Sequence, residues 1–467
     1  MANERISIHG IWTSRWVFIL AATGSAVGLG NIWKFPYMAG VYGGGAFVLV
    51  YLLCIALIGV PIMLAETVLG RRGRQSPVNT LRSLALQAGA SARWSWVAIT
   101  GMVAALLILS FYSVVAGWSL DYIIGMGRGE FVGIDGDSAG ARFGGLTADP
   151  WRLTLWHSLF MLVTGIIIAR GVVAGLEKSL RIMMPLLFVL LIVLLGYSMT
   201  TGYFMQGLTF LFHFDLSEVP DGILAAMGHA FFTLSIGVGS IMVFGSYMPK
   251  KSSIGGTVMT VALLDTVVAL TAGMALFPIV FAAGLEPTGG PGLMFVTLPI
   301  AFGNIALGQV FGLLFFVLVA MAAWSSAISM LEPAVAYWVE RTGRTRTQIT
   351  AAIALVCWIV GLGTVLSFNV LADARFFVTD ESGWSLFKWT TEGGKTLFES
   401  IDYLTSRIML PLGGLLFAVF AGWILGREVF RAELALRHPR MFPVVYWLLR
   451  YVAPVGVLIV FVTELLK

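Results

Sequence analysis

The chain has very little charge for its length, and this excludes an ordinary soluble protein. Only 11% of its 467 residues are Asp, Glu, Lys or Arg, whereas 58% are hydrophobic. A soluble globular protein carries roughly a quarter of its residues as charged side chains. The two cysteines, Cys54 and Cys357, lie inside apolar stretches, so neither a disulfide framework nor a cysteine metal site is expected. No His, Asp and Glu cluster has the spacing of a catalytic metal site, so the chain is not expected to be an enzyme.

Long apolar segments make up most of the chain, and a helix of about 20 apolar residues spans a bilayer. We expect eleven spans, at 15–39, 44–70, 94–124, 153–169, 182–201, 223–247, 256–282, 308–339, 348–370, 397–424 and 441–463. The stretches 125–152 and 371–396 are predicted to be surface loops, because they mix glycine with acidic residues. The sequence therefore predicts an all-α integral membrane protein, with residues 1–467 forming a single transmembrane domain.

Positive charge is unevenly divided between the segments that connect these spans. With the N-terminus inside the cell, most Lys and Arg residues, including Arg71, Arg72 and Arg74, fall on the inner side. The positive-inside rule thus predicts a cytoplasmic N-terminus and, after an odd number of spans, an external C-terminus. We expect a multi-pass protein of the cell's inner, cytoplasmic membrane, with the lipid bilayer as its surroundings. The net charge of +5 follows from this topology, so no nucleic-acid partner is expected.

Glycine gathers at two places where a membrane helix would have to be interrupted. The run 24–30 is GSAVGLG, and five spans later the run 231–240 is FFTLSIGVGS. Backbone unwinds at membrane depth only where it is buried in protein or lines a cavity, and its freed carbonyls can then bind a cation. Interruptions at matching positions predict two inverted repeats, approximately 12–201 and 223–424, with an extra helix at 441–463. Close packing between helices also selects glycine, so the pattern alone leaves both interpretations open.

Several runs in chain order carry a resemblance to a known family. They are GSAVGLGNIWKFPY from Gly24, GGGAF at 43–47, GVPIMLAETVLGR at 59–71, FYSVVAGW at 111–118, FFTLSIGVGS at 231–240 and WSSAISMLEP at 324–333. The chain resembles the neurotransmitter:sodium symporter family, many bacterial members of which have eleven helices. The resemblance implies the LeuT-type fold, a 5+5 inverted repeat in which helices 1 and 6 are broken. It also implies Na⁺-coupled symport of an amino acid or a related small molecule by alternating access.

By this resemblance, two sodium sites are expected. One consists of Ala26, Asn31, Thr233 and Asp265, and the other of Gly24, Val27, Ala322, Ser325 and Ser326. From spacing alone, the two serines are better explained by hydrogen bonds between helices, and it is the resemblance that favours their role as sodium ligands. Their hydroxyls and the Asn31 side chain favour sodium over a proton as the coupling ion.

Asp265 is a departure from the family pattern, since the best-known relatives have Asn there. Chloride-dependent relatives have a Ser one helical turn later, where this chain has Ala269. We therefore expect the Asp265 carboxylate to supply the negative charge that chloride brings elsewhere, so that chloride is not required. A rival hypothesis pairs Asp265 with His229, whose protonation would then modulate transport.

The same resemblance implies a substrate pocket in which Tyr112 and the backbone amides of Leu29 and Gly30 bind the substrate carboxylate. The full predicted set is Ala26, Leu29, Gly30, Ile108, Tyr112, Phe232, Thr233, Ser235, Val238, Ser326, Ser329 and Met330. The side-chain end of this pocket is apolar, so we expect a neutral aliphatic or aromatic L-amino acid. Two alternatives remain open, a Na⁺-coupled symporter of another small zwitterion or osmolyte and a proton-coupled amino-acid carrier of the same fold.

Gate residues are also implied by the resemblance. The expected outer pair is Lys34 with Asp402, and the expected inner residues are Trp12, Tyr247 and Glu340. The cationic partner at the inner gate is either Arg5 or His9. Two further intramembrane acids, Glu66 and Glu332, are expected to hydrogen-bond the unwound backbone. Separate inner and outer gates favour alternating access over a continuous channel.

Overall fold

The computed structural model describes residues 7–286, 292–380, 383–390, 393–436 and 439–466. In these ranges, nine continuous helical segments are long and apolar enough to cross a bilayer. They are Gly45–Gly73 (α3, α4), Ala92–Arg128 (α6), Pro150–Ala169 (α8), Val172–Met199 (α9), Ile254–Ala282 (α13), Gly308–Thr342 (α15), Arg346–Ser367 (α16), Leu397–Ile424 (α17, α18) and Pro439–Thr463 (α20, α21). The helices inside the compound segments are α3 (Gly45–Cys54), α4 (Val60–Gly73), α6 (Ser95–Arg128), α9 (Lys178–Met199), α17 (Leu397–Asp402), α18 (Leu410–Val419), α20 (Phe442–Trp447) and α21 (Ala453–Leu466).

Two further helical segments are broken at the places that the glycine runs predict, and the first of them is long and apolar enough to count as a tenth span among the described residues. The first consists of α1 (Arg15–Ala26) and the segment Gly30–Val41, which contains α2 (Phe35–Val41), and its two parts meet at an angle of 60°. The second consists of α11 (Val219–Thr233) and α12 (Ser240–Ser246), separated by the non-helical residues 234–239. Each of the eleven expected spans therefore has a helical counterpart.

Backbone conformation explains why both helices stop. At the first break Val27 is extended, with φ −73° and ψ 107°. In the second break Ser235, Gly237 and Gly239 have φ values of +51°, +89° and +81°. This left-handed region costs glycine little but cannot continue a right-handed helix.

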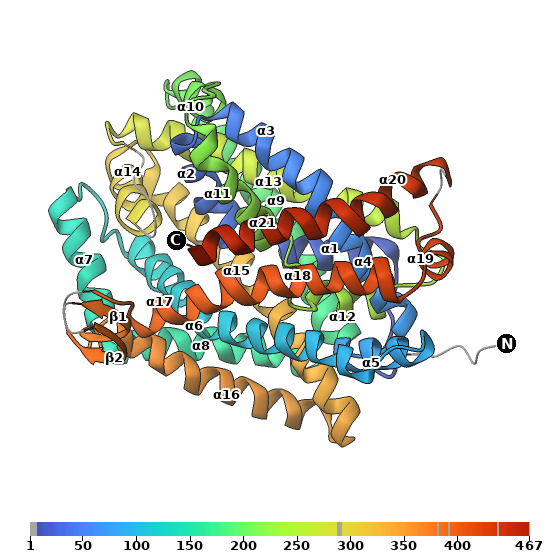
Figure 1. Ribbon diagram of the computed structural model, residues 1–467. Coiled ribbons are helices and arrows are strands. Elements are labelled where there is room, and N and C mark those ends of the chain that lie inside the picture. Colours follow the sequence, from blue (N-terminus) through green and yellow to red (C-terminus); the bar gives the residue numbers. More distant parts are fainter. Residues whose placement is uncertain (1–6, 287–291, 381–382, 391–392, 437–438, 467) are drawn as a thin grey trace.

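The long helices α6 and α15 pack along each other through the middle of the bundle, and α1 packs between α9, α13 and α15. The helices α16 and α21 run along the outside (Figure 1). Leu355, Val356 and Ile359 of α16 are each more than half exposed, as expected for apolar side chains that face lipid. The broken spans are therefore positioned by a buried scaffold rather than by the peripheral helices.

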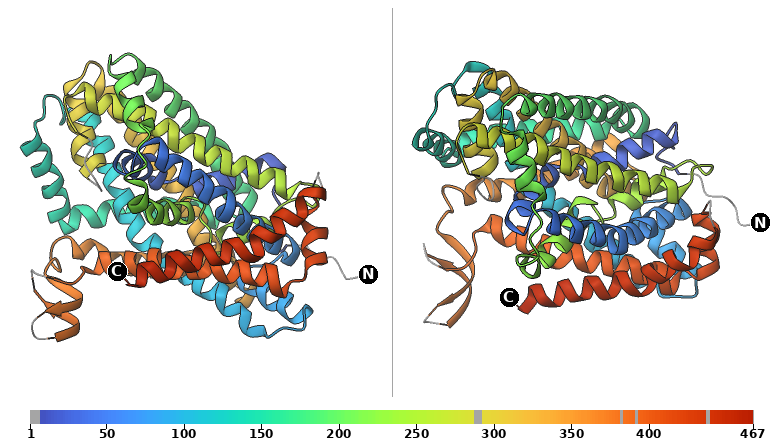
Figure 2. Two further views of the ribbon diagram at one scale, coloured as in Figure 1. Left: turned by 45° about the horizontal axis from the view of Figure 1, so that its top comes forward. Right: turned by 90° about the horizontal axis from the view of Figure 1, so that it is seen from above.

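Short elements cap the two ends of the bundle (Figure 1, Figure 2). One end carries α5 (Pro77–Gln87), α19 (Arg427–Leu434) and the start of α1, and the other carries α7 (Gly136–Ala148), α10 (Phe204–Phe212) and α14 (Leu298–Asn304). The helix α21 runs from the first end toward the second, as an odd number of spans requires. Which end faces the cytoplasm remains a prediction from the distribution of charge.

The two predicted surface loops contain regular structure, which corrects that prediction. The range 125–152 contains α7, and the range 371–396 contains an antiparallel hairpin of β1 (Ala374–Asp380) and β2 (Gly383–Trp389). Phe376 lies opposite Phe387 in the hairpin, with ring centroids 5.2 Å apart. Such cross-strand aromatic pairs stabilise hairpins, and the glycine and acidic residues of this range hide that signal.

Candidate functional site

The two breaks face each other across one cavity near the middle of the bundle. Its lining is Ser25, Ala26, Gly28, Leu29, Gly30, Asn31, Ile108, Tyr112, Phe232, Ser235, Val238, Ser326, Met330 and Leu410. Two hydrogen bonds join the breaks directly. The hydroxyl of Ser235 donates to the carbonyl of Ser25 at 2.6 Å, and the Asn31 amide donates to the hydroxyl of Thr233 at 2.9 Å.

Ten of the twelve residues predicted for the substrate pocket belong to this lining. The other two, Thr233 and Ser329, lie behind it, where the Ser329 hydroxyl is 2.8 Å from that of Ser25. The sequence prediction did not include Ser25, Gly28 or Leu410. Ser25 and Gly28 lie at the first break, so their position in the chain could have indicated that they line the cavity. Leu410 belongs to a helix far away in the sequence, and no feature of the sequence indicated its place in the lining.

A buried carboxylate forms the centre of the first predicted sodium site. Asp265 is 0% exposed and accepts hydrogen bonds from the Asn31 amide at 2.7 Å, the Thr233 hydroxyl at 3.0 Å and the Tyr51 hydroxyl at 3.2 Å. All three donors are neutral, and no Lys, Arg or His of the described residues forms an ion pair with it. A charge at membrane depth needs a partner of opposite sign. The cluster therefore has the oxygen ligands and the uncompensated negative charge that suit a hard cation.

The second predicted sodium site gathers backbone carbonyls around one serine. The Ser326 hydroxyl lies 3.4 Å from the Gly24 carbonyl, 3.4 Å from that of Ser25 and 3.3 Å from that of Val27. A hydroxyl has a single proton, so it cannot donate to all three carbonyls at once. On the same helix, the Ser325 hydroxyl donates to the Ala322 carbonyl at 2.9 Å. This concentration of partly unsatisfied oxygens also fits a cation.

Close approach of side chains explains why the first break contains glycine. A Cβ on Gly28 would lie 2.8 Å from the Ser326 hydroxyl and 3.1 Å from the Tyr112 hydroxyl, and one on Gly30 would lie 3.1 Å from the Phe232 ring. The amide of Leu29 donates to the Tyr112 hydroxyl at 3.4 Å. The Tyr112 hydroxyl and the backbone of this turn therefore lie together at the lining of the cavity.

The predicted outer gate pair is not closed. Among the described residues no ion pair joins Lys34 to Asp402, and Lys34 is exposed. Its ammonium group instead lies 5.3 Å from the centroid of the Phe232 ring. Asp402 accepts a hydrogen bond from Ser406 of the following turn at 2.8 Å.

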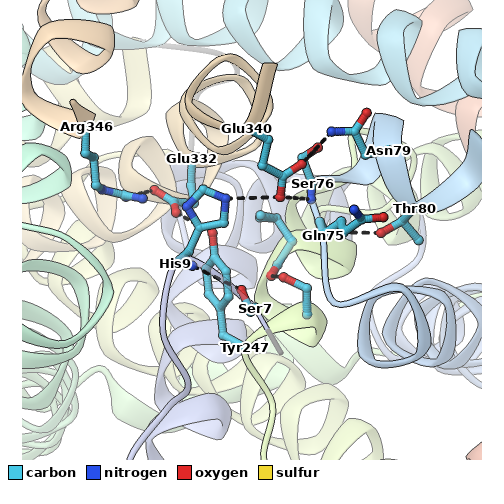
Figure 3. Close-up of polar contacts among 12 residues, drawn as sticks. Ser7, His9, Gln75, Ser76, Asn79, Thr80, Tyr247, Glu332, Glu340 and Arg346 are labelled. Atoms are coloured by element: carbon cyan, nitrogen blue, oxygen red, sulfur yellow. Dashed lines mark hydrogen bonds and ion pairs between the residues drawn. The ribbon is translucent and has the colours of Figure 1, made fainter. Parts of the chain in front are cut away.

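The opposite end of the path is closed by a buried polar network (Figure 3). Glu340 accepts hydrogen bonds from the Ser76 amide at 2.7 Å, the Ser76 hydroxyl at 2.5 Å and the Asn79 amide at 2.7 Å. The imidazole of His9 approaches the same carboxylate at 3.1 Å. His9 is therefore the residue that faces Glu340 in the structure, whereas Arg5 lies outside the described residues.

Aromatic residues seal the layer beneath this network. Trp12 and Tyr247 are 1% and 0% exposed. The Trp12 amide donates to the Tyr247 carbonyl at 2.9 Å, and its indole donates to the Phe244 carbonyl at 3.1 Å. The three residues predicted for the inner gate thus lie together at the closed end.

The two additional acids differ in their surroundings. Glu66 accepts a hydrogen bond from the Gly237 amide at 2.7 Å, so the structure places it against unwound backbone as expected. Glu332 does not contact unwound backbone, and this corrects the expectation. It accepts a hydrogen bond from the Tyr247 hydroxyl at 2.6 Å and pairs with the guanidinium group of Arg346 (Figure 3).

His229 is buried beside the first predicted sodium site, but the structure does not join it to Asp265. Both of its ring nitrogens lack a hydrogen-bond partner among the described residues. The ring instead packs against Phe35 and Tyr51, with centroids 5.6 Å away in each case. The contacts of Asp265 therefore give no support to the rival pairing.

Comparison with known proteins places these features in a family. The model of the sodium:neurotransmitter symporter family matches residues 9–127 and 143–372. An uncharacterised sodium-dependent transporter of Bacillus subtilis (strain 168) is 36% identical over 456 residues, covering 96% of both chains. The human sodium- and chloride-dependent GABA transporter 2 is 23% identical over 90% of this chain and 74% of its own length.

A solved structure is similar over the whole chain. The crystal structure of MhsT in complex with L-phenylalanine has 43% sequence identity and a TM-score of 0.86, and the match covers 97% of this chain and 99% of that one. The family match and this neighbour agree with the LeuT-type fold that the sequence predicts.

Proposed function

Since the chain belongs to the sodium:neurotransmitter symporter family and is a sodium-dependent symporter rather than an enzyme, we propose that it imports a neutral, hydrophobic L-amino acid together with Na⁺. The observation that carries this proposal is the cavity shared by the two breaks, whose lining combines residues of the unwound segments with apolar side chains. Alternating exposure of that cavity to the two sides of the membrane moves the substrate and its ions.

The chemistry of the lining supports the choice of substrate. Among the residues that the structure describes, no Asp, Glu, Lys, Arg or His lines it, and Ile108, Val238, Met330 and Leu410 are among its apolar residues. A charged substrate side chain would lie there without a partner, which is costly in a buried site. MhsT, which is similar over the whole chain, was crystallised with L-phenylalanine. A small polar osmolyte would leave the apolar part unfilled.

Two sodium ions would couple to this substrate through different contacts. We assign the first to Asp265, Asn31, Thr233 and the Ala26 carbonyl, beside the position of the substrate carboxylate. The second would lie among Ser326, Ser325 and the carbonyls of Gly24, Val27 and Ala322. The charge of Asp265 would replace that of chloride, so we expect transport to continue without chloride.

Uptake into liposomes tests the proposal. Purified protein with an imposed Na⁺ gradient should accumulate labelled Leu, Met, Phe or Trp, and replacing Na⁺ by choline should abolish accumulation. Ser326→Ala should raise the Na⁺ concentration needed for half-maximal uptake. The control Ser110→Ala removes a buried hydroxyl that only bonds its own helix, through the Leu107 carbonyl at 2.7 Å, and should change little. Uptake indifferent to choline, or confined to charged amino acids, would overturn the proposal.

Chloride dependence is tested separately. Wild-type uptake should persist when gluconate replaces chloride, whereas Asp265→Asn should make the remaining uptake depend on chloride. Loss of wild-type uptake in gluconate would contradict the assigned role of Asp265, as would an active Asp265→Asn variant that is indifferent to chloride.

A further inference from the structure

We propose that Leu410, the first residue of α18, is a specificity-determining residue that limits the length of the substrate side chain. This inference rests on the proposed function, because it concerns the same cavity. Leu410 is 4% exposed and is the one lining residue that comes from the segment Leu397–Ile424.

The backbone of the second break is clamped against α18 with no side chain between them. A Cβ on Gly413 would lie 2.2 Å from the Gly237 carbonyl oxygen, and a Cβ on Gly237 would lie 2.5 Å from the Leu410 carbonyl oxygen. From the other side, a Cβ on Gly101 of α6 would lie 2.8 Å from the same Gly237 oxygen. Contacts this short do not occur for real Cβ atoms, so each of these positions requires glycine.

A hydrogen bond holds the clamped peptide as well. The Gly237 amide donates to the Glu66 carboxylate at 2.7 Å. The backbone at Gly237 is therefore fixed from α6, from α18 and through Glu66 on α4. Because Val238 follows directly, its position relative to Leu410 is also fixed.

Because the backbone around Gly237 is held rigidly, the volume of the Leu410 side chain limits the length of the substrate side chain that the cavity can hold. Val238 and Leu410 are both almost fully buried, and neither backbone can retreat from a longer substrate. Met330, which also lines the cavity, can change its shape because its side chain is unbranched and flexible. In apolar pockets, one methylene group changes selectivity by about 10- to 200-fold, so the volume at Leu410 should weigh heavily.

The local helix geometry explains how Leu410 comes to face the cavity. A π-helical turn, Tyr403–Met409, directly precedes it. Such a turn inserts one residue relative to an α-helix and rotates the following side chains by about 100°. Pro411 lacks an amide hydrogen and sits in the first turn of α18, where a proline is tolerated. Periodicity over the whole segment therefore misassigns the face on which Leu410 lies.

Competition among substrates of different length tests the inference. Leu410→Ala should shift the ratio of Trp to Val uptake toward Trp by about tenfold, and Leu410→Phe should shift it toward Val by a similar factor. Leu410→Met conserves volume and should keep the wild-type ratio within about twofold. Leu412→Ala changes the same residue type two positions on, at a half-buried site outside the lining, and should leave the ratio unchanged.

Ratios measured on the same vesicles are independent of the amount of folded protein, so partial misfolding does not obscure the result. Wild-type protein that takes up no amino acid in the panel would refute the proposed function itself. Active wild type with the same substrate ratio in Leu410→Ala and Leu410→Phe would refute only the role of Leu410. Equal shifts in Leu412→Ala would refute it too, since they would reflect a general effect on the helix.

Discussion

The two ends of the transport path are held in very different ways. At the end where α1 begins, Glu340 takes part in four polar contacts from two separate parts of the chain, and Trp12 and Tyr247 are buried beside it. At the other end no ion pair joins Lys34 to Asp402 among the described residues, and the Lys34 ammonium group lies over the face of the Phe232 ring. The structure thus describes a molecule that is closed at the first end and not locked at the second. Opening the first end would break the buried hydrogen bonds of Glu340.

The contacts of Glu340 come from two different parts of the molecule. Ser76 and Asn79 follow α4 and belong to the scaffold, whereas His9 belongs to the segment that precedes α1. If this segment moves away, the carboxylate keeps its scaffold partners and loses one contact. At the closed end, Glu340 therefore has three hydrogen bonds from Ser76 and Asn79 and one contact with His9 of the segment that precedes α1.

Of the changes considered, replacing Glu340 should reduce the difference between the two ends most strongly, because it weakens the closed end. In Glu340→Gln one carboxylate oxygen is lost, and hydrogen bonds to charged groups are worth about 1.5–3 kcal/mol. We expect a cysteine at Ser246, which is 0% exposed, to react with a thiol reagent about tenfold faster from the α5 side. Labelling would be measured after Cys54 and Cys357 are replaced by Ala. Glu130→Gln, an acid at the other end, is the matched control, and equal rates in both variants would contradict the assigned role.

Strengthening the contact between residue 9 and Glu340 should stabilise the closed end, which is a smaller effect than that of Glu340→Gln and opposite in direction. His9→Arg places a forked, permanently charged group opposite Glu340. We expect uptake to slow by about three- to tenfold, corresponding to about 1 kcal/mol of added stability of the closed end, while substrate binding changes little. Uptake and equilibrium binding would be compared in the same preparation. His213→Arg, an exposed histidine elsewhere, controls for added charge, and faster uptake in His9→Arg would count against a link at this position.

The smallest effect is expected at the end where Lys34 and Asp402 lie, and it concerns thermal stability. Asp402→Asn should shift the thermal unfolding midpoint of substrate-free protein by less than about 2 °C, because no ion pair is lost. Asp121→Asn supplies the contrast, since Asp121 is 2% exposed and binds Arg142 at 2.8 Å and Arg152 at 2.6 Å. Breaking a buried pair costs about 3–5 kcal/mol, so that variant should unfold several degrees lower. A large loss in Asp402→Asn alone would show that the outer pair forms without substrate.

Much of the cavity could be predicted because its residues lie within two short runs. The glycine runs indicate the breaks at Val27 and at 234–239, and the family resemblance implies the places of residues such as Tyr112 and Ser326. Leu410 could not be predicted, because its place depends on a π-helical turn and on the packing of Gly413 against Gly237. The contact of Glu332 with Arg346 was missed for a similar reason, since two helices must first be brought side by side.

By itself, the sequence determined that this chain spans a membrane and which family it resembles, and that resemblance implied two interrupted helices. These properties depend on composition and on short runs of consecutive residues, so they can be recognised without the tertiary structure. Only the tertiary structure decided which residues meet across the bundle, that one end is closed while Lys34 and Asp402 form no ion pair at the other, and that Leu410 enters the cavity. Those features depend on distances between distant segments, and such distances are fixed only when the helices pack.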